Sequence, residues 1–503
     1  MSLPDWLAGL PDAERMRATD RWAVEERGIP SLDLMERAGG GLAALVRELS
    51  GDGPVVIACG KGNNGGDGYV AARLLREAGM DVRVLAAAPV DELHGDAAVN
   101  AHRLPGGPPE PFSRDALEGA AVAVDALLGT GFSGEPHGAV GEAIAALAAW
   151  DGPVVAADVP SGVDASTGEV AGAAVRAVAT ATFAASKPGL WINPGRSLAG
   201  EVRIIDIGIP QGAPVAAAEI GLIRDAAVLA LVPRRRPGWT KFDSGHVLVA
   251  GGARGLSGAP CLAAEAAQRA GAGYVTACVP ASLELIFEMR LLEAMTRGLP
   301  DSDGAHTEGG ARTVLELTAR GGALIAGPGL GRSDGATAFA RRVAAGAEVP
   351  LVLDADGLNA HAGDLGALAA RRAPTVLTPH EGELGRLLDV DSAAVKARRL
   401  HHARAAARAA QAIVVLKGDD TLVAEPGGTV GVSAGASAAL ATAGTGDVLS
   451  GVIAAVLARG VEPFAAACAG VRLHARAGMR AAAERGVDGV IARDVVDALP
   501  YAW

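Results

Sequence analysis

The chain has 503 residues, too many for one hydrophobic core, and about 100 to 200 residues per domain indicates at least two domains. Apolar residues make up 50% of it and glycines number 69, which is typical of globular α/β proteins and excludes disordered or fibrous classes. A formal net charge of -12 argues against a nucleic-acid-binding surface.

Neither the N-terminus nor the cysteines indicate export. Residues 1–22 are charged and lack the apolar core of a signal peptide, and no uninterrupted apolar stretch is long enough to predict a membrane span. The cysteines lack CxxC spacing, as expected of buried thiols in a reducing compartment. We therefore expect a cytoplasmic protein with no membrane or nucleic-acid partner.

Two amphipathic helical segments, 14–28 and 32–49, precede a series of short strands rich in Val, Ile and Ala that alternate with helical segments. This alternation predicts βαβ units and a parallel sheet covered on both faces. It ends near residue 210 and a second series begins at residue 246. The predicted fold class is α/β with two domains, at residues 1–215 and 225–503. The predicted strands lie within residues 54–59, 81–87, 121–129, 153–162, 179–184, 201–210, 246–252, 272–280, 322–331, 349–359, 374–384 and 412–425.

The first strand runs into the glycine-rich sequence CGKGNNGGDG. Gly60, Gly62 and Gly65 match the G-x-G-x-x-G dinucleotide pattern, but the next strand does not end in the acidic residue that would bind a ribose. Lys61 precedes the glycines instead of following them, so the pattern is not a P-loop. We expect a helix N-terminus suited to phosphate, with amide and carboxylate oxygens beside it. A tight turn would need only part of this set.

Two later loops follow neighbouring strands of the same predicted sheet, in the sequences DALLGTGFSGE and DVPSGVDASTG. Asp125 and Ser161 in these loops, with Asn64, bring oxygen atoms to adjacent strand ends, a set suited to a hard cation. Each could instead cap the helix that follows it.

The three motifs, in this order and spacing, resemble the NAD(P)H-hydrate epimerase family over about residues 10 to 210. The resemblance implies a Rossmann-like three-layer α/β/α domain that binds a hydrated nicotinamide dinucleotide and holds K⁺ at Asn64, Asp125 and Ser161. We expect Asp158 to be the acid/base that moves the proton. The implied substrate contacts are Asn63, Asn64, Gly65, Gly66, Asp67, Gly129, Thr130, Gly131, Phe132, Ser133, Gly134, Glu135 and Asp158.

The second half carries a Gly-rich turn, GTGD, that opens an apolar helix and ends at Asp447. Backbone amides beside a carboxylate supply an anion site and a base, the parts needed to move a phosphoryl group onto a hydroxyl. The sequence LKGDDT adds a cation and a hydroxyl after one strand, and TPHEGE places His380 after another. Asp447 could be only a helix cap and His380 only a structural residue.

These motifs, with GGARGLSGAP, GPGLG and LDADGLN, resemble the ADP-dependent NAD(P)H-hydrate dehydratase family over about residues 225 to 500. The resemblance implies a ribokinase-like fold, Mg²⁺ bound with ADP, and Asp447 as the base that acts on the hydrate. The implied contacts to the hydrate are Ala259, Gly329, His380 and Asp447. The implied contacts to the nucleotide are Lys417, Gly418, Asp419, Asp420, Thr421 and Gly446.

Together the two halves predict repair of hydrated NADH and NADPH: epimerisation of the R and S hydrates, and dehydration of the S form at the expense of ADP. One alternative is a ribokinase-like small-molecule kinase fused to a non-catalytic Rossmann-like regulatory module. The residues leave open ADP against ATP, NADH hydrate against NADPH hydrate, and which glycine of Gly327 to Gly331 contacts substrate. We expect a homo-oligomer of unstated size.

Overall fold

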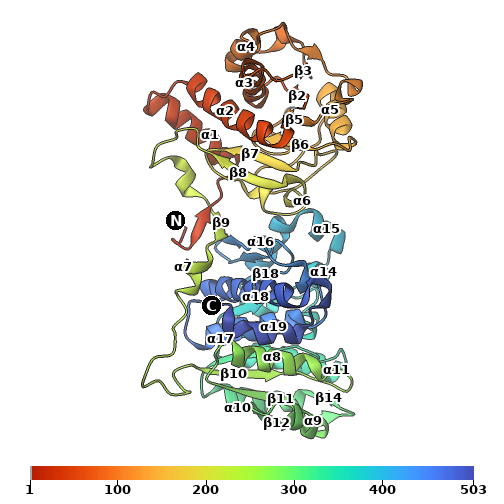
Figure 1. The fold of residues 1–503 in the computed structure, drawn as a ribbon. Helices are drawn as coiled ribbons and strands as arrows, with labels where there is room; N and C mark the ends of the chain where they lie inside the picture. The colour runs from red at the N-terminus through yellow and green to blue at the C-terminus, as the bar shows by residue number, and fades with distance from the viewer. Residues whose placement is uncertain (1–2, 52) are drawn as a thin grey trace. The chain divides into compact units, whose positions relative to one another are not determined.

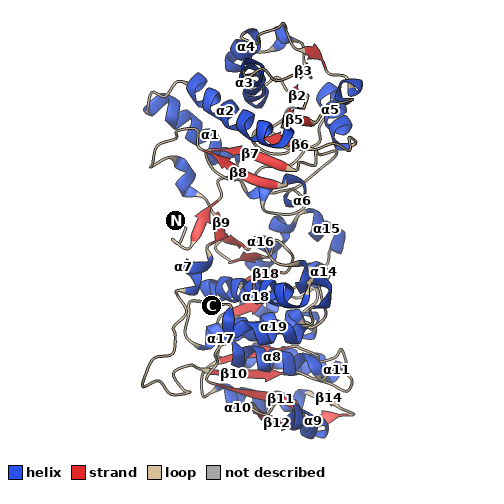
Figure 2. Cartoon of the chain, viewed as in Figure 1, coloured by secondary structure: helices blue, strands red, loops and turns tan. Residues whose placement is uncertain are grey.

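The computed structural model describes residues 3–51 and 53–503, which form two compact units (Figure 1). The first comprises Gly9–Gly221, and the second comprises Leu222–Trp503 together with Pro4–Ala8. The predicted fold class is confirmed, because each unit is built on a largely parallel sheet with helices packed against it (Figure 2). No helix in the described part of the chain is long and apolar enough to cross a membrane.

The first unit contains a seven-stranded sheet in the order β4-β3-β2-β5-β6-β7-β8, and every pairing in it is parallel. Four of the inner strands are buried along their whole length, as expected of a sheet covered on both faces. The strands are β2 (Val55–Cys59), β3 (Val82–Ala86), β4 (Glu110–Pro111), β5 (Val122–Ala126), β6 (Val154–Ala157), β7 (Ala179–Phe183) and β8 (Glu201–Ile205).

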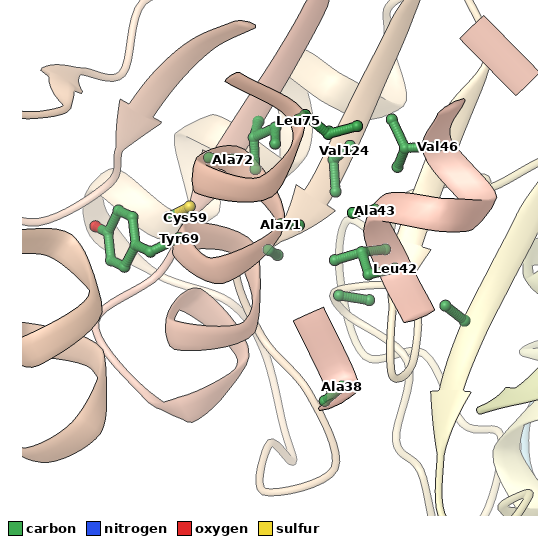
Figure 3. Packing of buried hydrophobic residues seen from close by; sticks show 14 of the residues in the cluster. Ala38, Leu42, Ala43, Val46, Cys59, Tyr69, Ala71, Ala72, Leu75 and Val124 are labelled. Atoms are coloured by element: carbon green, nitrogen blue, oxygen red, sulfur yellow. The ribbon is translucent and has the colours of Figure 1, made fainter. Parts of the chain in front are cut away.

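Alternate residues of β2 enter two separate cores, which gives this unit three layers. Ile57 packs with α2 and α3 on one face, where Leu42, Tyr69 and Leu75 are buried (Figure 3). Val56 packs on the other face, in the cluster that contains buried side chains of α5. The helices are α1 (Ala13–Arg21), α2 (Ser31–Ser50), α3 (Asn63–Glu77), α4 (Gly95–His102), α5 (Gly138–Ala148) and α6 (Arg196–Ala199), with a π-helical segment at Trp22–Glu26.

The second sheet has the order β1-β9-β20-β19-β18-β17-β16-β15-β10-β11-β12. Pairing is parallel from β18 to β12 and antiparallel for β18 with β19 and for β19 with β20. The strands are β1 (Leu7–Gly9), β9 (Ile220–Ile223), β10 (His246–Ala250), β11 (Tyr274–Pro280), β12 (Met295–Leu299), β15 (Ala323–Ala326), β16 (Leu351–Leu353), β17 (Thr375–Leu377), β18 (Ile413–Leu416), β19 (Leu422–Ala424) and β20 (Val430–Val432), with a hairpin of β13 (Asp301–Ser302) and β14 (Ala305–His306).

Helix α17 (Thr445–Ala458) lies at the centre of the second unit and is buried on nearly all sides, as its apolar sequence predicts. It packs against α8 and α18. The other helices are α7 (Asp225–Leu229), α8 (Gly258–Arg269), α9 (Glu284–Arg290), α10 (Ala311–Thr318), α11 (Asp334–Gly346), α12 (Asp356–Asn359), α13 (Gly366–Ala369), α14 (Glu381–Leu388), α15 (Ser392–Ala397), α16 (Arg399–Ala410), α18 (Pro463–Arg485) and α19 (Ala492–Ala498).

The glycines between β2 and α3 let backbone segments approach one another closely. A Cβ atom on Gly60 would overlap the carbonyl oxygen of Leu127, and a Cβ atom on Gly65 would overlap the carbonyl oxygen of Gly60. Gly68 faces Ala126 in the same way. These contacts hold the first turn of α3 directly against the ends of β2 and β5. The glycines therefore serve packing within the chain as well as any ligand.

Replacing Gly65 with alanine should destabilise the first unit by about 3 kcal/mol, because the added methyl group meets backbone that cannot rotate away. Gly62→Ala is the matched control, since nothing lies within 4 Å of its added Cβ. Scanning calorimetry of the full chain should show one unit melting earlier in Gly65→Ala and an unchanged profile in Gly62→Ala. Equal profiles for both variants would contradict this account of the close packing.

Candidate functional site

The polar residues predicted for the first unit gather at the carboxyl edge of its sheet. Asp125 is the penultimate residue of β5, and Asp158 follows β6 directly. Asn64 and Asp67 lie in the first turns of α3, which begins just after β2. Since parallel strands end at one edge of a sheet, side chains from three segments meet there.

Asp158 is buried and is held through both carboxylate oxygens. Lys187 Nζ lies 2.5 Å from Oδ1, while the backbone N–H and the hydroxyl of Thr130 donate to Oδ2, the former at 3.0 Å. Burial would raise the pKa of Asp158, but the charge and hydrogen bond of Lys187, together with Thr130, outweigh it and hold the pKa below its usual range. Asp158 is therefore a carboxylate at neutral pH.

Asp67 is a second buried carboxyl group at this edge of the sheet, and its pKa is shifted in the opposite direction. No hydrogen bond or ion pair to its side chain occurs among the described residues. Burial raises the pKa of Asp67 well above its ordinary value, and the nearby negative charges of Asp158 and Asp20 raise it further. The pKa values of the two carboxyl groups are thus shifted in opposite directions, which is a common arrangement for proton transfer.

The three residues predicted to hold a cation lie together. Ser161 donates to Asp125 through its hydroxyl (2.6 Å) and its backbone N–H (2.7 Å), and Asn64 Nδ2 donates to the Leu128 carbonyl (3.0 Å). Asn64 Oδ1 is buried and has no hydrogen-bond partner among the described residues. Burial raises the pKa of Asp125 to about 6 despite its hydrogen bonds from Ser161 and Leu127. An orphaned amide oxygen beside a carboxylate is a donor set that suits K⁺.

Gly129 joins this oxygen cluster to Asp158. A Cβ atom at Gly129 would lie 3.0 Å from Asn64 Oδ1 and 3.2 Å from Asp158 Oδ2. Farther along the same loop, Thr130 contacts Asp158, whereas Gly131, Ser133, Gly134 and Glu135 are exposed and Phe132 is half-buried. In α3, Asn63 is exposed, and Gly65 and Gly66 are buried.

Sequence reasoning missed Lys187. It lies after β7, in the sequence SKPG, and its side chain is 1% exposed. Its ammonium group also donates to Thr182 Oγ1 (2.8 Å) and to the Phe183 carbonyl (2.9 Å). A lone lysine between apolar segments is the signal that could have drawn attention to it.

In the second unit Lys417 is placed between two buried carboxylates. Its Nζ lies 3.2 Å from Asp354 Oδ1 and 3.5 Å from Glu383 Oε2. Burial alone would lower the pKa of Lys417, but these two negative charges outweigh it and raise the pKa. Ser450 donates to Asp354 Oδ2 at 2.7 Å. Asp354 follows β16 in the LDADGLN motif, and sequence reasoning assigned it no role.

Asp447 lies in the first turn of α17, near this cluster. Burial and the charge of Asp354 raise its pKa to about 7, although Lys417 opposes the shift. A Cβ atom at Gly446 would lie 3.3 Å from Lys417 Nζ, so the GTGD turn and the lysine are neighbours. A carboxyl group that titrates near pH 7 is suited to act as a general base.

His380 is the N-cap of α14, which is a structural role, as the alternative interpretation of this residue predicted. It also borders the cluster around Lys417. Its Nδ1 accepts from the backbone N–H of Gly382 (3.0 Å) and Glu383 (3.3 Å), and Glu383 accepts from the His380 N–H. Burial lowers the pKa of His380 although Glu383 opposes the shift. The accepted hydrogen bonds assign the ring proton to Nε2, on the half-exposed side of the ring.

Some side chains of the loop predicted to bind the nucleotide form hydrogen bonds to other groups of the protein. Asp420 is buried, and its Oδ2 accepts from Nε of the buried Arg399 at 3.0 Å. Thr421 donates its hydroxyl hydrogen to the Gly418 carbonyl at 2.7 Å. The side chains of Asp420 and Thr421 thus shape the loop, and Asp419 is exposed.

Gly329 lies beside Ala259, since a Cβ atom at Gly329 would be 3.3 Å from that of Ala259. Gly327 instead packs against the backbone of Asp354, and Gly331 donates its N–H to Asp356 at 3.0 Å. Of the three glycines in this turn, Gly329 is the one adjacent to Ala259, which was also predicted to contact the hydrate.

Two family models match the chain. Residues 31–189 match the YjeF-related protein N-terminus, and residues 247–501 match NAD(P)H-hydrate dehydratase. The chain belongs to the family of bifunctional NAD(P)H-hydrate repair enzymes. It is 42% identical to the member from Salinibacter ruber, over 97% of this chain and 95% of that protein, and 40% identical to the member from Moorella thermoacetica, over 98% and 96%. The family predicted from the sequence motifs is confirmed.

Among solved structures, the second half is similar to the ADP/ATP-dependent NAD(P)H-hydrate dehydratase from Bacillus subtilis, which was co-crystallised with ATP and Mg²⁺. The identity is 28%, the match covers 56% of this chain and 97% of that one, and the TM-score is 0.47.

Proposed function

We propose that the chain repairs hydrated NADH and NADPH with two catalysts, an epimerase at residues 1–215 and an ADP-dependent dehydratase at residues 225–503. The observation that carries the proposal is that each unit places an aspartate at a strand or helix end, Asp158 or Asp447, with a lysine near it, Lys187 or Lys417. Nearly full-length similarity to bifunctional repair enzymes supports both activities in one chain.

In the epimerase unit, the substrate carries a hydroxyl on the ring carbon next to the nicotinamide nitrogen. The nitrogen lone pair expels the hydroxyl, and water adds to the other face of the planar carbon. Asp158 is the carboxylate that moves the proton in this exchange. The first turn of α3 and the loop at 129–135 bind the dinucleotide around it.

A potassium ion would be held by Asn64, Asp125 and Ser161, whose oxygens include the orphaned Asn64 Oδ1. When bound, it would supply a fixed positive charge that holds oxygen atoms of the substrate. Asn64 and Gly129 bring that site next to Asp158.

In the dehydratase unit, Asp447 takes the proton from the ring hydroxyl of the S hydrate as the oxygen of that hydroxyl attacks the terminal phosphate of ADP. The backbone amides of the GTGD turn and Lys417 stabilise the charge on the transferred group. The C–O bond of this phosphate ester then breaks, phosphate leaves with the bonding electrons, the neighbouring ring carbon loses a proton to water, and the new C=C bond restores the nicotinamide ring. Ala259, Gly329 and His380 contact the hydrate, and the loop at 417–421 with Gly446 contacts the nucleotide.

Magnesium would enter with the diphosphate. Among residues 3–51 and 53–503, no group of three or more His, Cys, Asp or Glu side chains is placed to hold a metal ion alone. Phosphate oxygens therefore suit Mg²⁺ better than the protein does. We further propose a cytoplasmic homo-oligomer.

Mixed R and S hydrates, incubated with Mg²⁺, K⁺ and either ADP or ATP, should recover the full absorbance of reduced nicotinamide with the wild-type chain. In Asp158→Asn the S hydrate of the mixture should be dehydrated at the normal rate. Recovery from the R hydrate, which needs epimerisation first, should slow by about 100-fold to 10,000-fold, the range for loss of a general acid or base. Asp447→Asn should recover almost nothing while it still interconverts the epimers. No recovery with either nucleotide would favour the small-molecule kinase reading.

The dehydratase should depend on pH through Asp447. As a base it must be ionised, and its pKa is raised to about 7, so kcat/KM for the S hydrate should rise with pH, reach half its maximum near pH 7 and then level off. Initial rates from pH 5.5 to 9 at constant ionic strength check this. A rate that is flat across this range would contradict a base with this pKa.

Potassium should stabilise the first unit and activate it. At about 100 times its dissociation constant, a bound ion adds about 2.7 kcal/mol of stability. The melting temperature of the wild-type chain should therefore rise in KCl relative to choline chloride of equal ionic strength, along with the epimerisation rate. Asn64→Leu should remove both responses, whereas a response that survives in this variant would place the ion elsewhere.

A further inference from the structure

Lys187 is a buried cation in the epimerase unit's site, and its burial needs an explanation. A buried ammonium group is costly unless it is paired and hydrogen-bonded. Its three N–H donors are matched by three acceptors: Asp158 Oδ1 at 2.5 Å, Thr182 Oγ1 at 2.8 Å and the Phe183 carbonyl at 2.9 Å. With no donor left and 1% exposure, Lys187 does not reach a ligand itself.

Asp158, in contrast, keeps an edge open to the site, because 11% of its side chain remains exposed. Its backbone lies in the left-handed region, with φ of 65°, which a non-glycine residue adopts only where its surroundings hold it. Lys187 holds one oxygen of Asp158 and Thr130 holds the other. Whatever Lys187 does for the reaction therefore passes through Asp158.

Other carboxyl groups face the same carboxylate. Asp67 approaches from α3 and Asp20 from α1, and both interact electrostatically with Asp158 and Lys187. Without a nearby cation, burial and the carboxyl groups of Asp67 and Asp20 would disfavour a negative charge on Asp158. Lys187 is the cation that the described contacts of Asp158 provide.

We propose that Lys187 is the positioning residue of the epimerase site, which aims the Asp158 carboxylate at the substrate and balances its charge. This inference rests on the proposed epimerase function. When the hydroxyl leaves with its bonding electrons, the nitrogen lone pair forms a C=N bond and the ring becomes positive next to Asp158. As water adds, a C–O bond forms, the C=N electrons return to nitrogen, and the proton lost by the water goes to the carboxylate. Asp158 then gives this proton to the expelled hydroxide, which becomes water, so the carboxylate is ionised again at the end of each turnover.

The test measures epimerisation of purified R hydrate by the full chain, without nucleotide, in wild type, Lys187→Met, Asp158→Asn and the double variant. Lys187→Met should lower kcat by about 100-fold, in the range for a disrupted acid/base group, and leave KM within about twofold because Lys187 does not touch substrate. In the Asp158→Asn background, the same change should have almost no further effect. The dehydration rate of the S hydrate in each variant controls for an intact second unit.

The pH profile separates positioning from simple loss of folded protein. Wild-type kcat/KM should fall only at a more acidic pH than in Lys187→Met, because the Lys187 charge holds the pKa of Asp158 below its usual range against Asp67 and Asp20. In Lys187→Met the rate should begin to fall at a higher pH than in the wild type, since Asp158 then takes up a proton more readily. A smaller fraction of folded protein would lower the whole profile and leave its shape unchanged.

Thr182→Val serves as a milder variant if Lys187→Met does not fold. It removes one acceptor of Lys187 at nearly constant volume, and kcat should fall by about 3-fold to 10-fold. A normal rate and profile in Lys187→Met, or equal losses in the wild-type and Asp158→Asn backgrounds, would overturn the inference. So would a normal rate in Thr182→Val when Lys187→Met is unfolded. Absence of epimerisation in the wild type would instead refute the proposed function.

Discussion

The contact on which the epimerase site depends is the one between the start of α3 and the backbone of the strand ends beneath it. Gly65 sits against the Gly60 carbonyl so closely that a single methyl group would overlap it. Because of this contact, Asn64 reaches the Leu128 carbonyl and Asp67 is buried beside Asp158. Close packing of bare backbone thus places side chains from α3, β5 and the loop after β6 within one small volume.

Both units solve the same electrostatic problem at the ends of their strands. A reactive carboxyl group must be partly removed from water, and removal from water disfavours its charge. In the first unit Lys187 holds the pKa of Asp158 below its usual range, whereas burial raises the pKa of Asp67, which lacks a partner among the described residues. In the second unit Lys417 is shared by Asp354 and Glu383, and Asp447 is left with a pKa near neutrality. Burial thus raises the pKa of Asp67 and Asp447, and the neighbouring lysine opposes this shift in both units.

The predicted cation site and the predicted nucleotide loop show that a sequence indicates which residues belong to a site better than it indicates what each residue does there. Asn64, Asp125 and Ser161 could be grouped from sequence because each lies at or just after the end of a strand of one parallel sheet, and such strands end at one edge. For the loop at 417–421 the same reasoning assigned five successive residues to a nucleotide. The structure divides them, because Asp420 turns inward to the buried Arg399 while Asp419 is exposed. The direction of a side chain in a loop depends on partners elsewhere in the chain.

The sequence by itself determined the alternation of strands and helices, the two α/β units and the family, because these follow from local apolar patterns and from motifs of consecutive residues. Only the tertiary structure decided that Lys187 pairs with Asp158, 29 residues away, and that Asp354 pairs with Lys417, 63 residues away. The physical reason is that a charge is stabilised by what surrounds it in space. Parallel strands joined by helices bring together side chains that are far apart along the chain.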